Sequence, residues 1–291
     1  MEEDLAKGVR LPRQLYLRVP RSMRQMQTTE PIFTHAFVRH VSRSLANCEL
    51  THLPRQPFRL ALAAQQHQAY VDALRATGIN VTVLPEEPEL PDAVFVEDMA
   101  VMLDELIVVC RPGRVSRQPE IERILPALAN VRQLSRIAAP GTLDGGDVLM
   151  IGKTLFVGLS ERTNGKGLRQ LESIVLRHGY RVVPVTIDGC LHLKTALTQV
   201  APHVILANPH WVDPVTFADL DVLPVPTSEP WGANTLWING VLLTTASAPR
   251  TTELLRSRGL NARPLEISEL EKAEAGLTCL SLLYRGPRVE L

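Results

Sequence analysis

The alternation of hydrophobic and polar positions predicts strands and helices that follow one another from Ile32 onward. FTHAFVRH has the pattern of a strand, and RLALAAQQHQAYVDALRATG has that of an amphipathic helix that stops at Gly78. INVTVLP then predicts a short strand that Pro85 ends. Residues 1–31 show no such period. We therefore expect an N-terminal extension over residues 1–31 and a single α/β domain over residues 32–291.

One unit recurs along the chain. It has a short apolar strand, a tight turn, a second apolar strand, a loop with an arginine, and a helix that leads into another strand. Three copies begin at Asp98, Gly146 and Ala233. Their turns have sequences that suit two-residue hairpins, Asn-Gly most of all, and are Asp104-Glu105, Gly152-Lys153 and Asn239-Gly240. More divergent units fit before the first copy and between the second and the third, so the count is about five.

Repeated units of this kind bury their faces against their neighbours. A radial arrangement closes such an array without open sheet edges, so we predict a pseudo-symmetric propeller of five ββαβ units. In that arrangement the late strand TCLSLLY would complete the first unit. A linear solenoid is the alternative, but it would require atypical capping repeats, which the sequence does not show.

Composition narrows the class of function. The 291 residues include 31 basic and 31 acidic ones, so no net field would recruit nucleic acid or an anionic membrane. No apolar run reaches the roughly 18 residues of a membrane span, and the N-terminus has no hydrophobic signal region. Cys48, Cys110, Cys190 and Cys279 are far apart, which predicts a reduced, cytoplasmic protein without a metal or cofactor motif.

The repeat predicts that the starts of the inner strands meet at the central axis. Those starts carry Glu97-Asp98, Asp144-Gly145-Gly146-Asp147, His192 and Cys279. Taken singly, the acids suit solvated turns, the histidine suits a core and the thiol suits core filling. Taken together, several carboxylates fit a planar guanidinium. An imidazole moves protons near neutral pH, and a nearby cation activates a thiol.

Several motifs then carry a resemblance to a known family. DAVFVED, RPGRVSR, LDGGDVL, FVGLSERTN, LHLKT, SELEK and LTCLS stand in the order found in dimethylarginine dimethylaminohydrolases. These enzymes belong to the guanidino-modifying (pentein) superfamily. The resemblance implies a five-unit α/β propeller that needs no cofactor or metal and acts on a small guanidino compound. It also implies a homodimer, since relatives are often dimers.

The resemblance also implies the catalytic roles. Cys279 would attack the guanidinium carbon of a methylated arginine as a thiolate. His192 would protonate the departing amine and then activate water, which gives citrulline through a thiouronium intermediate. Asp144 would hold the guanidinium and orient the site, with Glu97 and Asp98 assisting.

The remaining roles concern the amino-acid end of the substrate. Arg117 and Arg162 match ligands of the substrate carboxylate, and Asp92 matches the residue near its α-amine. Leu50, in the stretch SLANCELTH, matches a lid residue that contacts substrate through its backbone, and Ala273 matches another backbone contact.

Three other functions use similar machinery and stay open at this point. They are hydrolysis of unmethylated arginine or another guanidino compound, amidino transfer to an acceptor amine, and zinc binding without catalysis. Cys190 is a rival nucleophile, because on an alternating strand it would share a face with His192.

Overall fold

The computed structural model describes residues 33–286 and places their fifteen strands in five three-stranded sheets. In every sheet the middle strand pairs antiparallel with one neighbour and parallel with the other. The strands, in the spatial order of each sheet, are β15 (Leu282–Tyr284), β1 (His35–Arg39) and β2 (Asn80–Leu84); β3 (Ala100–Met102), β4 (Ile107–Val109) and β5 (Leu134–Arg136); β6 (Val148–Ile151), β7 (Thr154–Leu159) and β8 (Arg181–Thr186); β9 (Leu197–Ala201), β10 (Val204–Ala207) and β11 (Asp221–Pro224); and β12 (Leu236–Ile238), β13 (Val241–Thr245) and β14 (Ala262–Leu265).

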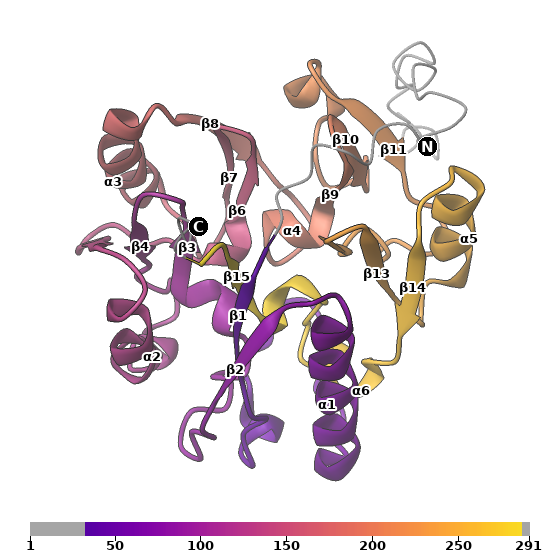
Figure 1. Ribbon diagram of the computed structural model, residues 1–291, viewed down its shortest axis with the longest axis horizontal. Helices are drawn as coiled ribbons and strands as arrows, with labels where there is room; N and C mark the ends of the chain where they lie inside the picture. The colour runs from indigo at the N-terminus through magenta and orange to yellow at the C-terminus, as the bar shows by residue number, and fades with distance from the viewer. Residues whose placement is uncertain (1–32, 287–291) are drawn as a thin grey trace, which may run out of the picture.

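A parallel pair of strands needs a crossover connection, and in four of the five sheets a helix supplies it. These helices are α1 (Leu60–Ala76), α2 (Glu120–Ala129), α3 (Gly165–Val175) and α5 (Pro249–Ser257), all at the periphery in Figure 1. The other helices are short and are α4 (Leu193–Ala196), α6 (Ser268–Glu271) and the 3-10 helices η2 (Leu45–Asn47), η3 (Val96–Met99), η4 (Val115–Arg117), η5 (Gly145–Asp147), η6 (Leu176–His178), η7 (Pro214–Phe217) and η8 (Thr278–Leu280). The divergent fourth unit crosses over through η7 alone.

The predicted hairpin turns are present. Ile238 pairs with Val241 across Asn239-Gly240, whose φ angles are +45° and +80°. Both values are positive, which Asn and Gly tolerate better than other residues and which matches the twist of a two-residue hairpin. The Asn239 side chain is also bonded to the backbone of Phe33, which joins the start of the described chain to this hairpin.

Five hydrophobic clusters pack the units together, and successive residues of a middle strand face different clusters. In β1, Ala36 and Val38 face one cluster and Phe37 faces the next, because side chains alternate across a strand. The clusters join units one and two, two and three, three and four, four and five, and five and one. Both faces of the middle strands are therefore buried, which explains their continuous apolar runs.

The end of the chain returns to the first sheet. Tyr284 pairs with His35 in an antiparallel ladder, so the expected completion of the first unit is confirmed. The expectation that all of TCLSLLY forms the strand is wrong at its start, because residues 278–280 form η8 and the strand begins at Leu282.

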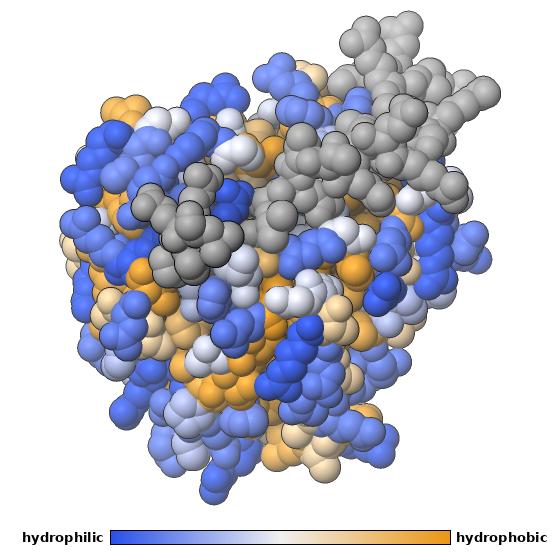
Figure 2. All heavy atoms as spheres, viewed as in Figure 1, coloured by the Kyte–Doolittle hydropathy of each residue, from blue (hydrophilic) through white to orange (hydrophobic). Residues whose placement is uncertain are grey.

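The surface is mixed in polarity. Hydrophilic residues cover most of the face in Figure 2, and hydrophobic residues show between them. Among residues 33–286, no helix is both long and apolar enough to cross a membrane. The N-terminal extension expected over residues 1–31 lies outside the described residues.

Candidate functional site

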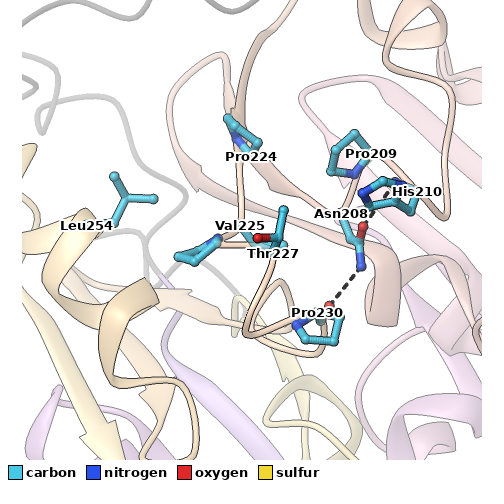
Figure 3. Close-up of a pocket in the computed structure, with 9 residues that line it drawn as sticks. Asn208, Pro209, His210, Pro224, Val225, Thr227, Pro230 and Leu254 are labelled. Atoms are coloured by element: carbon cyan, nitrogen blue, oxygen red, sulfur yellow. Dashed lines mark hydrogen bonds between the residues drawn. The ribbon is translucent and has the colours of Figure 1, made fainter. Parts of the chain in front are cut away.

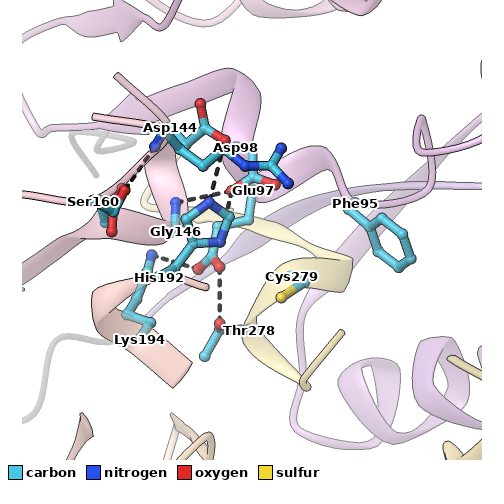
Figure 4. Close-up of polar contacts among 12 residues, drawn as sticks. Phe95, Glu97, Asp98, Asp144, Gly146, Ser160, His192, Lys194, Thr278 and Cys279 are labelled. Carbon is cyan, nitrogen blue, oxygen red and sulfur yellow. Dashed lines mark hydrogen bonds and ion pairs between the residues drawn. The ribbon is translucent and has the colours of Figure 1, made fainter. Parts of the chain in front are cut away.

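His192 lies between two carboxylates at the meeting point of the units. Its Nε2 is 3.2 Å from Oδ2 of Asp144, and its Nδ1 is 3.9 Å from Oδ1 of Asp98. The three groups come from the residue before α4, the residue before η5, and η3, and all are buried (Figure 4). The predicted meeting of these segments is confirmed.

The glycine pair after Asp144 makes this approach possible. A Cβ on Gly145 would lie 2.0 Å from the carbonyl oxygen of Glu97, and one on Gly146 would lie 2.7 Å from Nδ1 of His192. Both distances are far below van der Waals contact. The backbone N–H of Gly146 also donates to Oδ1 of Asp98 at 3.0 Å. The sequence DGGD is therefore required where η3, η5 and His192 pack together.

The charges around His192 favour its imidazolium form. Burial opposes that form, but Asp98, Asp147 and Asp144 outweigh it and raise the pKa of His192 to about 9. Burial likewise opposes the charged form of Asp98, but His192 and Arg117 lower its pKa to about 2. At neutral pH the site thus holds a protonated imidazole between carboxylates, ready to donate a proton.

Asp147 supports the backbone next to His192. Its Oδ1 accepts the N–H of Leu193 at 3.0 Å and its Oδ2 accepts the Ser160 hydroxyl at 2.6 Å. Burial raises the pKa of Asp147 to about 6. Residues 145–147 form η5, which begins directly after Asp144 and contains Asp147. The 3-10 turn lets two nearby acids serve separate partners.

A second polar network lies beside this one. Glu97 pairs with Nζ of Lys194 and accepts the Thr278 hydroxyl at 2.8 Å. Asn234 joins Thr278 to the carbonyl of Lys194. Burial raises the pKa of Glu97, although Lys194 counteracts it. Sequence reasoning missed Lys194, Thr278 and Asn234 as single residues, although Lys194 and Thr278 lie in the motifs LHLKT and LTCLS and Asn234 lies at the start of the third copy of the repeat.

Cys279 sits on η8 directly after Thr278, so the Thr278–Glu97 bond holds the thiol beside the carboxylates (Figure 4). The Gly276 N–H donates to its Sγ at 3.4 Å. Burial, followed by Glu97 and Asp98, raises the pKa of Cys279 to about 12. The thiol is thus neutral until a positive charge arrives.

Cys190 does not share this environment. It lies 6% exposed in a hydrophobic cluster, and its Sγ points to the carbonyl oxygen of His192 at 3.6 Å. Burial raises its pKa to about 12. The assumption of an alternating strand is wrong here, because residues 189–192 form a bend that enters α4. Cys48 and Cys110 are also buried, and burial raises the pKa of Cys48 to about 11.

The two arginines predicted to bind a carboxylate differ in their surroundings. Arg117 is buried and paired with Asp98 and Glu120, and its remaining N–H groups reach backbone carbonyls. Arg162 is 2% exposed, donates from Nη2 to the Thr51 hydroxyl at 2.9 Å, and has no partner at Nε. A buried donor without a partner is costly. The geometry thus leaves Arg162, more than Arg117, a donor for an anionic group.

The other predicted contacts surround a segment from residue 44 to residue 53, which we call the lid. Oδ2 of Asp92 accepts the backbone N–H of Glu49 at 3.1 Å. Leu50 follows in the lid and is half-buried, and Ala273 is buried in the turn after α6. DAVFVED forms a turn followed by η3. The turn points Asp92 to the lid and Asp98 to His192.

Asp98, Asp144 and His192 also lie close enough together to be considered as ligands of a metal ion. One ligand atom from each lies within 4.8 Å of the others. However, Arg117 already pairs with Asp98, and both ring nitrogens of His192 face carboxylates. The donor set therefore fits an ion-paired histidine.

Two cavities lie outside this network. A groove of about 430 Å³ is lined by prolines, His210 and Leu254 and lies between the fourth unit and α5 (Figure 3). It contains no group of the His192 network. A cavity of about 280 Å³ borders the loop between α6 and η8 and is lined in part by Leu53, Asn234, Glu274 and Gly276. The chemistry thus adjoins the smaller cavity.

Comparison with solved structures shows to which class of fold the chain belongs. A cysteine-to-serine variant of dimethylarginine dimethylaminohydrolase from Pseudomonas aeruginosa, in complex with citrulline, superposes with a TM-score of 0.82 at 32% identity, covering 87% of this chain and 100% of that one. The N-terminal domain of the cyanobacterial arginine dihydrolase ArgZ superposes with a TM-score of 0.78 at 16% identity, covering 87% and 98%. The fold is therefore the mixed α/β fold of the guanidino-modifying pentein superfamily.

Sequence comparisons define the family. The model for N,N dimethylarginine dimethylhydrolase of eukaryotes matches residues 55–214. Dimethylarginine dimethylaminohydrolases of Pseudomonas aeruginosa and Streptomyces coelicolor are 34% and 39% identical to the chain; the alignments cover 87% and 86% of it, and 100% and 96% of those proteins. The chain belongs to the dimethylarginine dimethylaminohydrolase family.

Proposed function

We propose that this protein hydrolyses Nω-methylated arginine, asymmetric dimethylarginine or monomethylarginine, to citrulline and an alkylamine. The single observation that carries the proposal is the geometry that holds His192 between Asp98 and Asp144, with Cys279 placed beside the same carboxylates by the Thr278–Glu97 bond. In this setting the pKa of His192 and that of Cys279 are both raised, which favours a charged imidazole and a neutral thiol. Such a pair is idle until a cation binds among the carboxylates. A methylated guanidinium is a cation that also offers an amine as leaving group.

The first step is activation by the substrate. A guanidinium among Glu97, Asp98 and Asp144 offsets the negative charge that holds the thiol neutral, so the Cys279 proton leaves to solvent. The thiolate attacks the central guanidinium carbon and forms a C–S bond. His192 donates its proton to the alkylated nitrogen, the C–N bond breaks, and the amine departs from an S-alkylthiouronium.

The second step is hydrolysis. Neutral His192 takes a proton from water, and the hydroxide forms a C–O bond at the same carbon. The C–S bond then breaks, the thiolate is expelled, and the oxygen proton is lost as citrulline forms. Two steps with a good leaving group replace one difficult hydrolysis.

The amino-acid end of the substrate has its own proposed contacts. Arg162, with a free donor at Nε, would bind the α-carboxylate together with Arg117. Asp92 would bind the α-ammonium, and the backbone of Leu50 and Ala273 would complete the contact. The buried position of these groups around the lid supports this assignment.

The finer architecture and setting belong to the same proposal. We propose that the five units form a closed pseudo-symmetric propeller, which the cluster between units five and one supports. Four unpaired cysteines support a cytoplasmic location. A homodimer stays a prediction from the resemblance.

A parallel assay tests the function. Purified protein is incubated with asymmetric dimethylarginine, monomethylarginine and arginine, and citrulline and the released amine are measured. Citrulline from the methylated substrates, with dimethylamine or methylamine in equal amount, is expected. Ammonia from arginine alone would favour a deiminase. A new guanidino product with added glycine would favour amidino transfer, and bound zinc in an inactive protein would favour the binding role.

A further inference from the structure

The lid is held to the rest of the molecule by carboxylates on either side of Leu50. On one side, Asp92 accepts the N–H of Glu49. On the other side, Glu274 accepts the backbone N–H groups of three consecutive lid residues, which are Thr51, His52 and Leu53. The Thr51 N–H lies 3.0 Å from Oε1 of Glu274. Neither the motifs nor the resemblance pointed to Glu274.

The Glu274 carboxylate is well placed to hold the lid by hydrogen bonds. Three N–H groups that converge on one carboxylate form a charge-assisted set, which is stronger than neutral hydrogen bonds. Glu274 is 7% exposed, so little water competes with the lid for its oxygens. The lid residues 51–53 belong to no helix or strand, so these N–H groups are not used in regular structure. Removal of the carboxylate would leave all three without this partner.

The backbone of Glu274 is held in an unusual conformation. Its φ is +59°, in the left-handed region that residues other than Gly, Asn and Asp seldom adopt. Such strain persists where the surrounding structure requires it, and often near functional sites. Here it lies in the loop between α6 and η8, two residues before Gly276, whose N–H donates to Sγ of Cys279. One short loop thus carries both the lid contact and the backbone donor to the thiol.

We infer that Glu274 is a positioning residue that latches the lid to the loop between α6 and η8, and so sets substrate affinity and access to Cys279. The inference rests on the proposed function for its kinetic part only. A lid that is released samples open states, and the apparent affinity for substrate falls by the fraction of time that the lid is closed. The chemistry at Cys279 and His192 stays in place, because Glu274 contacts neither side chain.

The cavity of about 280 Å³ next to the latch gives the lid room to move. Leu53 of the lid and Glu274 both line it, together with Gly276. Packing therefore leaves the lid room on this side. The lid is also held by the bond from Glu49 to Asp92 and by the bond from Arg162 to the Thr51 hydroxyl, and Glu274 is the restraint that meets three consecutive lid N–H groups.

The test compares Glu274→Gly, Glu274→Gln and Glu274→Ala with the parent protein. Glycine suits the positive φ, so the Gly variant removes the latch without new strain. Gln keeps one acceptor oxygen and is the conservative variant. For Glu274→Gly and Glu274→Ala we expect KM to rise about tenfold while kcat changes less than about threefold. In these two variants iodoacetamide should alkylate Cys279 about fivefold faster than in the parent protein, as measured by peptide mass spectrometry. The rate for Glu274→Gln should lie between that of the parent and those of the other two variants.

Glu269→Ala is the matched control. Glu269 is a buried carboxylate just before the same loop and accepts the Arg59 N–H, but it contacts no lid residue. It should leave KM and alkylation unchanged. Equal KM and alkylation in Glu274→Gly and the parent would overturn the latch, as would equal acceleration in Glu269→Ala. If no methylated arginine is turned over, the proposed function fails, but the alkylation rates still decide the latch.

Discussion

The two reactive groups of the site lie in contrasting surroundings. His192 bonds through Nε2 to Asp144 and faces Asp98 with Nδ1 at 3.9 Å. These two carboxylates are themselves bonded to Gly146, Gly113 and Arg117. The Cys279 thiol has one backbone donor, from Gly276. The same acids that keep the imidazole charged keep the thiol neutral. Under the proposed mechanism the acid is therefore charged in the free protein, whereas the thiol ionises only when a cationic substrate binds.

Loss of the nucleophile should have the largest effect. Cys279→Ser should lower kcat for asymmetric dimethylarginine at least about 10⁴-fold, because a serine hydroxyl is not ionised by the bound cation. Unfolding temperature should change little, since the swap conserves size. Cys190→Ser is the control and should retain turnover. If Cys190→Ser were inactive and Cys279→Ser kept its turnover, Cys190 and not Cys279 would be the nucleophile.

Loss of one carboxylate should make the imidazole less basic. Asp98→Asn removes the largest charge that raises the pKa of His192, so the pKa should fall. The alkaline limb of the pH–kcat profile should then move to lower pH, and kcat at neutral pH should fall about 10²-fold. Asp147→Asn is a comparison at a carboxylate that bonds to the Leu193 backbone. An unmoved alkaline limb in Asp98→Asn would disprove the charge argument.

Much of this architecture was predictable, and the reason is local chemistry. Asn239-Gly240 specifies its hairpin, the apolar runs specify strands buried on both faces, and the repeat brought His192, Asp144 and Asp98 together. The contacts between distant segments were not predictable. Lys194 meets Glu97, and Glu274 meets the lid, across separations that no local pattern encodes. The predicted starts of the inner strands were wrong, because the short 3-10 helices η3, η5 and η8 precede the strands at those positions.

Loss of the unpaired donor should have a moderate effect. Arg162→Ala should raise KM for methylated arginine about tenfold, with kcat little changed, because one charged contact to the α-carboxylate is lost. Methylated guanidines without a carboxylate should be turned over equally by the variant and the parent. Steady-state kinetics with both substrates check this. An equal loss of turnover with both kinds of substrate would show that Arg162 does not act by binding the α-carboxylate.

The smallest effect concerns stability. The pKa of His192 is raised to about 9 in the folded protein from 6.5. The resulting stabilisation is complete below pH 6.5 and is lost as pH rises through 9. His192→Gln should therefore flatten the decline of unfolding free energy over this range, by up to about 3 kcal/mol. Urea titrations at several pH values measure it, and parallel declines in both proteins would refute it.

The most direct test of the central claim traps the sulfur adduct. His192→Ala is mixed with S-methyl-L-thiocitrulline, whose thiolate leaves without a proton donor, so the covalent intermediate should form and persist for want of a base. Peptide mass spectrometry should find the substrate, less methanethiol, on Cys279. An adduct on Cys190, or no adduct while the parent protein still forms citrulline from the same compound, would contradict the account.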